Sequence, residues 1–257
     1  MFNLESFDIK LDTEFIGRNF IYSDEVDSTN SILLDKNGNY KQHGTVFLAE
    51  KQLRGKGRKD RIWYSTKDLN LTFSILLTNN KYYQKNLNFV NFASSLAVAI
   101  SIENLYQRRI ELKWPNDVLI NRKKTAGILL ESQSQGNVIE KLVIGFGVNV
   151  NQTVFQGTFK ISPTSLKLEL NETLDRERLL AEILNNFEQF LETAPKDPGW
   201  ILKEWKLRCN MIGEKISITD DDNAKYGIFN DIDDDGFLLL RNGDKIEKIY
   251  FGDVSVI

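Results

Sequence analysis

The segment that sets the architecture of the chain is residues 45–77, TVFLAEKQLRGKGRKDRIWYSTKDLNLTFSILL. Its first part, Thr45–Glu50, is a short apolar run typical of a buried strand. In Leu69–Leu77 the residues that share one face of an extended chain are Leu, Phe, Ile and Leu, which predicts a second strand. Arg54–Trp63 lies between them and carries five cations around two glycines. We therefore predict two core strands joined by a strongly basic loop.

This basic loop has the composition of an anion-binding loop. Gly55 and Gly57 lack a Cβ, so we expect the backbone there to adopt positive φ and to bring N–H groups close to a ligand. Arg58 and Arg61 can each present a planar fork to phosphate oxygens, and the indole of Trp63 can stack on a base. The loop is predicted to bind a nucleotide, and to become ordered when it does, because its cations repel one another.

Hydrophobic periodicity predicts a mixture of helices and strands over most of the chain. Apolar residues recur at three and four positions along residues 87–106 and 176–191, which predicts two long helices packed on a sheet. Shorter helices are predicted at 27–35 and 198–208, and further strands at 19–22, 110–114, 118–120, 125–131 and 138–150. Beyond Met211, short strands are separated by Asp-rich or Asn-Gly turns, at 216–218, 225–231, 237–241 and 246–251. The prediction is a body of helices and strands followed by a small β-barrel or meander.

Composition excludes several classes of protein. The net charge is −3, so the basic loop is a local feature, and a nucleic-acid-binding module would need a broader basic surface. A single Cys209 excludes an internal disulfide framework, and a single His43 excludes the usual zinc sites. The N-terminus lacks the pattern of a secretion signal, and the apolar runs fall short of a membrane span. We expect a cytoplasmic protein with no membrane or nucleic-acid partner and no metal site of its own.

Three further segments combine polar or basic residues with proline or glycine. In Lys113–Asp117, KWPND, the proline ends a strand and leaves an Asn-Asp pair at its edge, although a simple turn explains it equally. Lys124 lies at a strand entrance before Gly127, where an exposed basic turn is the alternative. Gly145–Asn149, GFGVN, alternates glycines on one face, which either admits a ligand beneath the asparagine or allows close helix packing. Each segment alone permits both readings.

One acidic segment matches the opening of a calcium-binding loop. Asp231, Asp233, Asp235 and Gly236 have the required spacing, but the twelfth position is Asn242 in place of a bidentate glutamate. The residues on either side predict strands. We therefore predict an acidic turn.

Five motifs follow one another along the chain. They are Asp27-Ser28-Thr29-Asn30; Gln52 with Gly55-Lys56-Gly57-Arg58 through Arg61 and Trp63; Lys113-Trp114-Pro115-Asn116-Asp117; Lys124 with Ala126-Gly127-Ile128; and Gly147-Val148-Asn149. In this order they resemble the biotin protein ligase family, the biotin–acetyl-CoA-carboxylase ligases, from Ile21 to the C-terminus. One departure is that the family usually has Gly-Arg-Gly-Arg, whereas Lys56 here keeps the charge of the first arginine but loses its planar fork.

The resemblance implies an α+β fold with two domains. Residues 1–209 would form a catalytic domain of the biotin/lipoate ligase type, a mixed sheet with helices packed on it, and residues 210–257 a small SH3-like β-barrel. The family often carries a winged-helix DNA-binding domain at its N-terminus, and here only 26 residues precede Asp27. We therefore expect the form that lacks this domain, a ligase without repressor activity.

The resemblance also implies a two-step reaction. The biotin carboxylate attacks the α-phosphate of ATP to give biotinyl-5′-adenylate and pyrophosphate, and a lysine of an acceptor protein then attacks this mixed anhydride. Bringing two anions together requires cations that offset their repulsion and hold the attack geometry. Lys124 is expected to bridge the carboxylate and the α-phosphate, Asp117 to orient Lys124, and Arg58 to act with them on the phosphates.

The binding roles follow from the same motifs, residue by residue. The ureido ring of biotin requires neutral donors and acceptors. The residues expected to bind biotin are Ser28, Thr29, Asn30, Gln52, Lys56, Gly57, Lys124 and Gly127. The residues expected to bind the nucleotide are Arg58, Arg61, Trp63, Asn116 and Asn149.

The implied substrates are biotin and ATP, with Mg²⁺ carried by the ATP phosphates, and no tightly bound prosthetic group. The implied partner is a biotin carboxyl carrier protein, or the carrier domain of a biotin-dependent carboxylase, and a homodimer is left open. A lipoate or octanoate ligase of the same superfamily is the alternative, although such enzymes use a different glycine-rich signature.

Overall fold

The computed structural model describes residues 2–78, 81–136, 138–220 and 223–257. The strands are β1 (Phe20–Val26), β2 (Thr45–Gln52), β3 (Leu71–Thr78), β4 (Glu111–Lys113), β5 (Asp117–Ile120), β6 (Lys123–Gln135), β7 (Val138–Val148), β8 (Lys215–Asp220), β9 (Asn223–Ile232), β10 (Leu238–Asn242), β11 (Lys245–Ile249) and β12 (Asp253–Val256). The helices are α1 (Leu4–Asp8), α2 (Thr29–Leu34), α3 (Lys81–Lys85), α4 (Leu87–Tyr106), α5 (Leu166–Leu170), α6 (Arg176–Thr193) and α7 (Pro198–Arg208).

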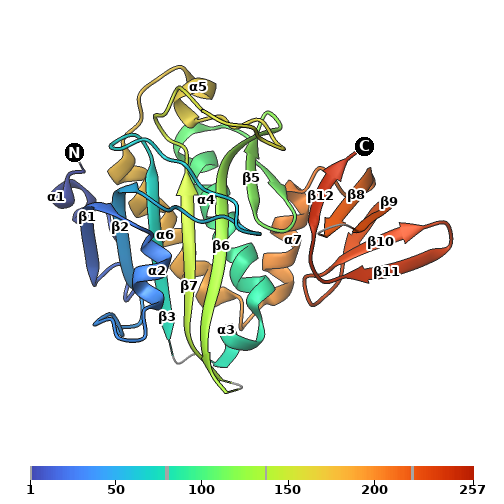
Figure 1. The fold of residues 1–257 in the computed structure, drawn as a ribbon, viewed down its shortest axis with the longest axis horizontal. Helices are drawn as coiled ribbons and strands as arrows, with labels where there is room; N and C mark the ends of the chain where they lie inside the picture. The colour runs from blue at the N-terminus through green and yellow to red at the C-terminus, as the bar shows by residue number, and fades with distance from the viewer. Residues whose placement is uncertain (1, 79–80, 137, 221–222) are drawn as a thin grey trace.

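The strands form two sheets that lie side by side (Figure 1). The seven-stranded sheet has the order β1-β2-β3-β7-β6-β5-β4, and the five-stranded sheet has the order β11-β10-β9-β8-β12. β1 pairs with β2 in parallel, and β2–β3, β3–β7 and β7–β6 are antiparallel. The large sheet is therefore mixed, as predicted, and the C-terminal strands form a separate antiparallel sheet.

The centre of the large sheet is divided into an aromatic face and a face of small residues. Phe73 of β3 pairs in register with Phe146 of β7, and the two buried rings stack with 4.6 Å between their centroids. Because side chains alternate along a strand, the neighbouring Ser74, Gly145 and Gly147 occupy the opposite face. The aromatic face forms the core, and the face of small residues is left for the site.

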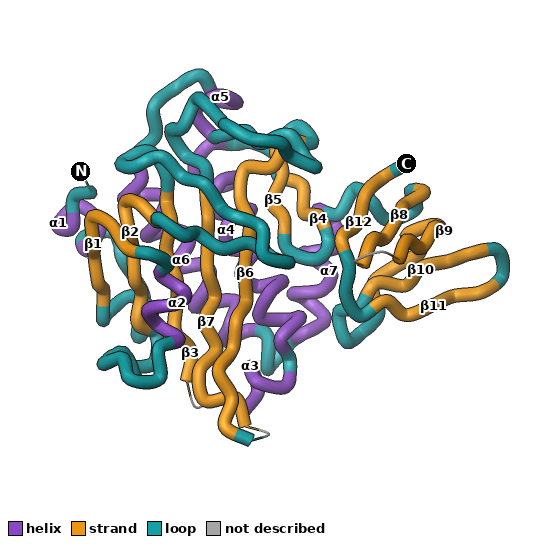
Figure 2. The backbone as a smooth tube through the Cα atoms, viewed as in Figure 1, coloured by secondary structure: helices purple, strands orange, loops and turns teal. Residues whose placement is uncertain are grey.

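Helices cover the aromatic face. Figure 2 shows α4, α6 and α7 behind the large sheet, while α2 lies on its other side. Phe146 meets Phe187 of α6 edge to face, with 5.7 Å between the centroids. Trp205 of α7 stacks on Phe92 of α4 and donates its indole N–H to the Ser95 hydroxyl at 3.1 Å. The apolar stripes of the three helices thus form one continuous core with the sheet.

Helix α4 is more apolar than the sequence analysis allowed for. It has 20 residues with a mean hydropathy of 1.2, so the expectation that no apolar run reaches the length of a membrane span is wrong for α4 by length and composition. Within the structure, 67% of this segment is buried, against the sheet and against α6 and α7. Its apolar character is thus accounted for by the core of the protein.

The small sheet encloses its own buried apolar residues, among them Ile216, Phe229 and Leu238. Its last strand, β12, pairs with β8 and was not predicted as a separate element. The chain enters β12 through Gly252, whose φ is +137°. A Cβ at this position would overlap the Ile218 side chain, so the turn requires glycine. This turn places Asp253 at the start of β12, on the side that faces the large sheet.

The acidic segment between β9 and β10 forms a turn, as predicted. Asp233 accepts the backbone N–H groups of Asp235 and Phe237 at 3.0 and 2.8 Å. Lys248 forms ion pairs with Asp233 at 2.7 Å and with Asp235 at 2.9 Å. The carboxylates of this turn are therefore occupied by protein donors.

Most of the predicted elements are confirmed, and 87–106 and 198–208 are helices with the predicted bounds. The elements that were not predicted are short: α1, α3 and α5 have five residues each and β12 has four. Segments of this length are too short to show a helical or strand period in the sequence.

Candidate active site

A cavity of about 610 Å³ lies over the face of small residues, beneath the segment that joins β2 to β3. That segment crosses the front of the large sheet and reaches towards the small sheet (Figure 1). The cavity lining includes every residue for which the sequence analysis expected a catalytic or binding role: Ser28, Thr29, Asn30, Gln52, Lys56, Gly57, Arg58, Arg61, Trp63, Asn116, Asp117, Lys124, Gly127 and Asn149. The fold thus brings together five motifs that are far apart in the chain.

One end of the cavity, the neutral end, is a chain of hydrogen bonds through Gln52, Thr29, Ser74 and Asn30. Gln52 Oε1 accepts the Thr29 backbone N–H at 2.8 Å and lies 3.0 Å from the Thr29 hydroxyl oxygen. The hydroxyls of Thr29 and Ser74 are 2.6 Å apart, and Ser74 donates to Asn30 Oδ1 at 2.5 Å. Asn30 Nδ2 in turn donates to Glu131 at 2.8 Å. These uncharged groups are therefore fixed in position before any ligand binds.

Helix α2 carries two of these residues and is held at both of its ends. The Ser28 side chain caps the N-terminus and accepts the Ser31 N–H at 3.5 Å. At the C-terminus, Lys141 Nζ donates to the carbonyls of Leu33 at 3.0 Å and Asp35 at 2.7 Å. Lys141 is buried, which lowers its pKa. Ser28 thus has a structural role besides lining the cavity.

The other end of the cavity, the charged end, is formed by Arg58, Arg61, Lys113, Asp117 and Lys124. Lys124 Nζ lies 2.5 Å from Asp117 Oδ1, and Lys113 Nζ lies 3.8 Å from Asp117 Oδ2. Burial lowers the pKa of Lys113, and the charge of Asp117 opposes this effect. The predicted contact between Lys124 and Asp117 is thus present, and Lys113 is a second ammonium that was not predicted.

The backbone of Lys124 is fixed by strand-like contacts. Its N–H donates to Ser162 O and its carbonyl accepts from Thr164 N, both at 2.9 Å. The side chain is 27% exposed and ion-paired, and its Nζ lies 5.5 Å from the centre of the Trp63 ring. The alternative of an exposed basic turn is therefore wrong for Lys124.

The glycines of β6 and β7 make room for two side chains. A Cβ on Gly147 would overlap the Trp63 indole, and a Cβ on Gly127 would lie 3.3 Å from it. A Cβ on Gly145 would overlap Asn30 of α2, so close helix packing explains this one glycine. Gly147 instead opens a slot on the cavity face of the sheet, and the indole occupies it.

Two buried polar atoms in the cavity lining make no hydrogen bond within the described ranges. They are Nε1 of Trp63, a donor, and Oδ1 of Asn149, an acceptor. Asn149 Nδ2 donates to Thr164 O at 3.0 Å, so its amide is oriented while its oxygen stays available. Buried polar atoms are costly without a partner, so this pair is a candidate contact for a ligand with both kinds of group.

The conformation of the basic loop differs from the prediction. Neither Gly55 nor Gly57 has positive φ; the left-handed residues are Lys59 and Asp60, with φ of 53° and 56°. Gly55 is required for space instead, because a Cβ there would overlap the carbonyl oxygen of Trp63. The loop is a tight hairpin, so its reversal takes place at the tip, two residues beyond Gly57.

The cations of the loop are paired with carboxylates from other elements. Lys56 lies 3.4 Å from Glu131 of β6, and Lys59 lies 2.8 Å from Asp220 of β8. The idea that the loop is dominated by repulsion between its own cations is therefore incorrect, because its charges are neutralised from outside the loop.

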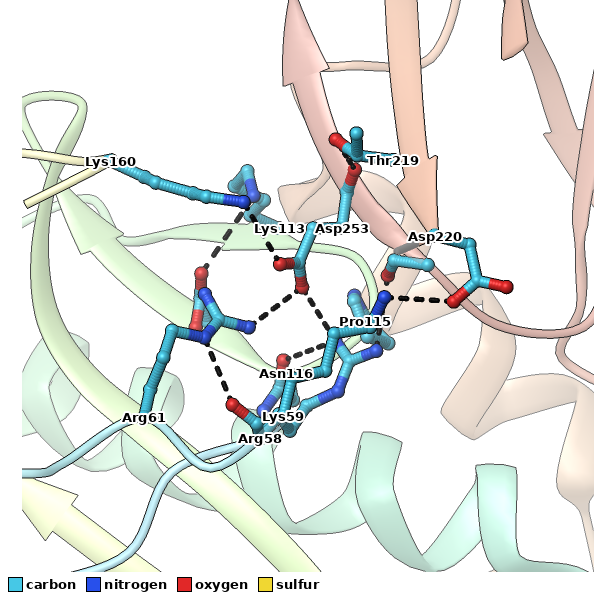
Figure 3. Close-up of polar contacts among 12 residues, drawn as sticks. Arg58, Lys59, Arg61, Lys113, Pro115, Asn116, Lys160, Thr219, Asp220 and Asp253 are labelled. Carbon is cyan, nitrogen blue, oxygen red and sulfur yellow. Dashed lines mark hydrogen bonds and ion pairs between the residues drawn. The ribbon is translucent and has the colours of Figure 1, made fainter. Parts of the chain in front are cut away.

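Arg58 and Arg61 both reach the small sheet. Arg61 Nη2 lies 2.9 Å from Asp253 Oδ1, and Arg58 Nη1 lies 3.6 Å from the same oxygen (Figure 3). Arg58 Nη1 also donates to Asn116 Oδ1 at 3.3 Å. Burial lowers the pKa of Arg58, and the nearby carboxylates of Asp253 and Asp117 partly reverse this effect. The predicted phosphate ligands are thus held by protein acceptors in this structure.

Sequence reasoning missed several residues of the site. Lys113 lies in the Lys113–Asp117 motif that the sequence analysis identified, so its position in this motif could have predicted that it lines the cavity. Ser74 is one polar residue in an apolar strand, and Glu131 lies on a long strand with no motif. Lys160 and Asp253 come from a loop and from the last strand, which only the tertiary structure brings to the cavity.

No group of three or more His, Cys, Asp or Glu side chains in the described part of the chain is arranged to hold a metal ion. Asp117 and Asp253 in the cavity lining are each paired with lysine or arginine.

Two family models match the chain. One is described as the Biotin/lipoate A/B protein ligase family and matches residues 22–149. The other is described as the Biotin protein ligase C terminal domain and matches residues 211–256. The first covers the cavity residues from α2 to β7, and the second covers the small sheet.

Similar proteins include a bifunctional ligase/repressor BirA of Bacillus subtilis, 34% identical over 96% of this chain and 76% of that protein. A biotin–[acetyl-CoA-carboxylase] ligase of Paracoccus denitrificans is 33% identical over 76% of this chain and 82% of that protein. A biotin protein ligase of Aquifex aeolicus, solved in complex with biotin and ATP, superposes with a TM-score of 0.79 at 28% identity, covering 93% of this chain and 99% of that one.

Proposed function

Because the chain belongs to the biotin protein ligase family, we propose that its cavity performs both steps of biotin attachment, with biotin at the neutral end and the nucleotide at the charged end. The enzyme uses biotin and ATP as substrates, and its acceptor is the carboxyl carrier protein or domain of a biotin-dependent carboxylase. The observation that carries the proposal is the ion pair of Lys124 with Asp117, 2.5 Å long, at the charged end of the cavity.

The first step joins two anions. A carboxylate oxygen of biotin forms a bond with the α-phosphorus of ATP, the bond from this phosphorus to the bridging oxygen breaks, and pyrophosphate leaves. Lys124 donates to the attacking carboxylate and to a non-bridging α-phosphate oxygen, which lowers their repulsion and aligns them. Asp117 orients the Lys124 ammonium through one carboxylate oxygen, and Lys113 lies 3.8 Å from the other oxygen of the same carboxylate.

In the second step, the neutral amine of the acceptor lysine attacks the acyl carbon of biotinyl-5′-adenylate. The bond from this carbon to the phosphate oxygen breaks, AMP leaves with the electron pair, and the amine loses a proton. The cations at the charged end stabilise the leaving phosphate. The same residues therefore serve both steps.

The neutral end suits the head group of biotin. A ureido ring presents two N–H donors and one carbonyl acceptor and carries no charge. Gln52, Thr29 and Asn30, with the Ser28 hydroxyl, offer neutral hydrogen-bonding groups that are already fixed in position. Gly57, Gly127 and Lys56 also line the cavity and are assigned to biotin, and Lys56 lies 3.4 Å from Glu131.

The nucleotide is assigned to the charged end. Arg58 and Arg61 bind its phosphates, and Asn116 orients Arg58. The available oxygen of Asn149 can accept an N–H of adenine, and the Trp63 indole lies over the same part of the sheet. Mg²⁺ enters with ATP and is held mainly by its phosphates.

Several broader features stay proposals. We place the boundary between the catalytic and C-terminal domains at residues 209 and 210, since α7 ends at Arg208 and the second family model begins at residue 211. We further propose that the enzyme works in the cytoplasm without a nucleic-acid partner. Whether the enzyme forms a homodimer is tested by measuring its molecular mass in solution.

The proposed activity is tested by ATP–pyrophosphate exchange and by transfer of biotin to a purified acceptor domain, detected with streptavidin. Biotin should support both, and lipoate should support neither. The lipoate alternative is disfavoured because the model that matches the small sheet is specific to biotin protein ligases. Exchange that depends on lipoate instead of biotin would overturn the proposal.

A further inference from the structure

The charged end of the cavity already holds an anion that belongs to the protein. The Asp253 carboxylate lies 2.9 Å from Arg61, 3.6 Å from Arg58 and 3.5 Å from Lys160 (Figure 3). Its side chain is only 13% exposed. Burial by itself would raise the pKa of Asp253, but Arg61 and the other cations lower it overall, so the carboxylate is ionised at neutral pH. One carboxylate thus forms ion pairs with cations from two separate loops.

We propose that Asp253 is a resident counter-anion of the phosphate site: it holds Arg58, Arg61 and Lys160 in the nucleotide-free enzyme and releases them to a polyphosphate. Asp253 is in this sense a positioning residue that competes with the substrate for the same cations. The inference rests on the phosphate role of Arg58 and Arg61 in the proposed function.

Arg58 and Arg61 already donate hydrogen bonds to protein acceptors, which a phosphate would have to replace. Arg58 Nη2 donates to Gly252 O at 3.1 Å, and Arg58 Nη1 is shared between Asn116 and Asp253. Arg61 donates through Nε to Arg58 O and through Nη2 to Asp253, both at 2.9 Å. A guanidinium has five N–H donors in fixed directions, and these contacts occupy donors of both arginines. Phosphate oxygens can bind through the occupied donors only by replacing the protein acceptors.

The loop does not depend on Asp253 for its own shape. Gly57 N–H donates to Arg61 O at 2.6 Å and Trp63 N–H donates to Gly55 O at 2.9 Å, so its backbone closes on itself. A second contact with the small sheet, between Lys59 and Asp220 at 2.8 Å, does not involve Asp253. Neutralising Asp253 should therefore free the cations without unfolding the hairpin or detaching the C-terminal sheet.

A competitor that occupies a site lowers the apparent affinity of the ligand for that site, and its removal restores the affinity. The test is calorimetric titration with inorganic pyrophosphate of the wild-type enzyme and the Asp253→Asn variant, which keeps the shape of the side chain and removes its charge. We expect D253N to bind pyrophosphate about tenfold more tightly. Asp253→Glu should return the affinity towards the wild-type value, because the charge is restored.

The matched control is Asp235→Asn, which removes one carboxylate from the same small sheet, paired with Lys248 and outside the cavity lining. D235N should bind pyrophosphate as the wild type does. Should D253N be too unstable to titrate, Asp253→Ser is used in its place, with the same expected gain. Equal or weaker binding by the neutral variant, with measurable wild-type binding, overturns the inference and leaves the proposed function standing. Absence of binding in both proteins overturns the phosphate role of Arg58 and Arg61 as well.

Discussion

The two ends of the cavity hold their functional groups by different means. At the neutral end, Thr29, Ser74 and Asn30 hydrogen-bond one another in a buried chain fixed to α2 and β3. At the charged end, Arg58 and Arg61 lie on a loop and form ion pairs with Asp253 of the small sheet. Hydrogen bonds among buried neutral groups fix geometry, whereas partly exposed ion pairs can be exchanged for other charges.

This difference matches the ligands assigned to the two ends. An uncharged ring is recognised by the directions of its hydrogen bonds, so its protein partners must be rigid before it binds. A polyphosphate is recognised by charge, and its partners can be held by other anions until it binds. Lys124 belongs to the charged end but is proposed to contact both substrates, so its removal should have the largest effect on their reaction.

Lys124→Ala should slow formation of the adenylate about 10²- to 10³-fold, because it removes the charge that bridges the two reacting anions. Biotin-dependent ATP–pyrophosphate exchange measures this step. The control is Lys123→Ala, which removes a neighbouring cation that is half exposed and paired with Glu169. Comparable exchange rates in the two variants would exclude Lys124 from the mechanism. The melting temperature of K124A should stay close to that of the wild type.

Arg58→Ala should affect the charged end alone. We expect the intermediate to leave the enzyme about 10- to 100-fold faster, since a partly buried charged contact to its phosphate is lost. Release is measured by trapping biotinyl-5′-adenylate from a preloaded enzyme. Arg54→Ala is the control, because Arg54 is 82% exposed and its carboxylate partner Asp27 is 3.8 Å away. Retention of the intermediate at the wild-type rate by R58A would argue against the phosphate assignment.

Ser74→Ala tests the neutral end. Loss of the hydroxyl leaves Asn30 Oδ1 without its donor, so the KM for biotin should rise about tenfold while the KM for ATP stays unchanged. Steady-state exchange kinetics with each substrate varied in turn give both constants. Ser94→Ala is the control, since its buried hydroxyl bonds only the backbone of α4, at Val90 O. A parallel rise in both KM values would mean that the two ends are not independent.

The sequence predicted these two ends to different extents. Lys124 and Asp117 were paired in advance, because each lies in a motif and their charges are complementary. Ser74 could not be identified, since one serine in an apolar strand carries no signal until the facing strand and helix are known. Asp253 is 192 positions from Arg61 along the chain, and nothing local to either residue indicates their contact.

In the basic loop, the predicted backbone conformation was wrong. The density of cations predicts an anion site, which stays a prediction, and the loop lines the cavity. The glycines suggested positive φ, but Gly55 is needed for close approach to Trp63, and the reversal falls on Lys59 and Asp60. Glycine permits several backbone shapes, so its presence alone does not show which one is used.

The smallest effect is expected from His43, which lies away from both ends of the cavity. Its Nδ1 accepts the Thr78 N–H at 3.0 Å, and its ring stacks on Phe15. Burial lowers the pKa of His43 below its ordinary value of 6.5. The unfolded chain then binds a proton before the folded chain does, so stability is complete above pH 6.5 and falls as the pH drops towards the lowered pKa.

Thermal unfolding between pH 8 and pH 5 measures this effect, with His43→Asn as the reference, because an amide oxygen can accept the same hydrogen bond without titrating. We expect the wild type to lose about 2 °C more than H43N over this range. The KM for biotin at pH 7 should be the same in both proteins, since His43 contributes to the body of the fold and to neither end. Identical pH profiles would mean that the protonated ring keeps its place, and the buried-neutral assignment of His43 would then be wrong.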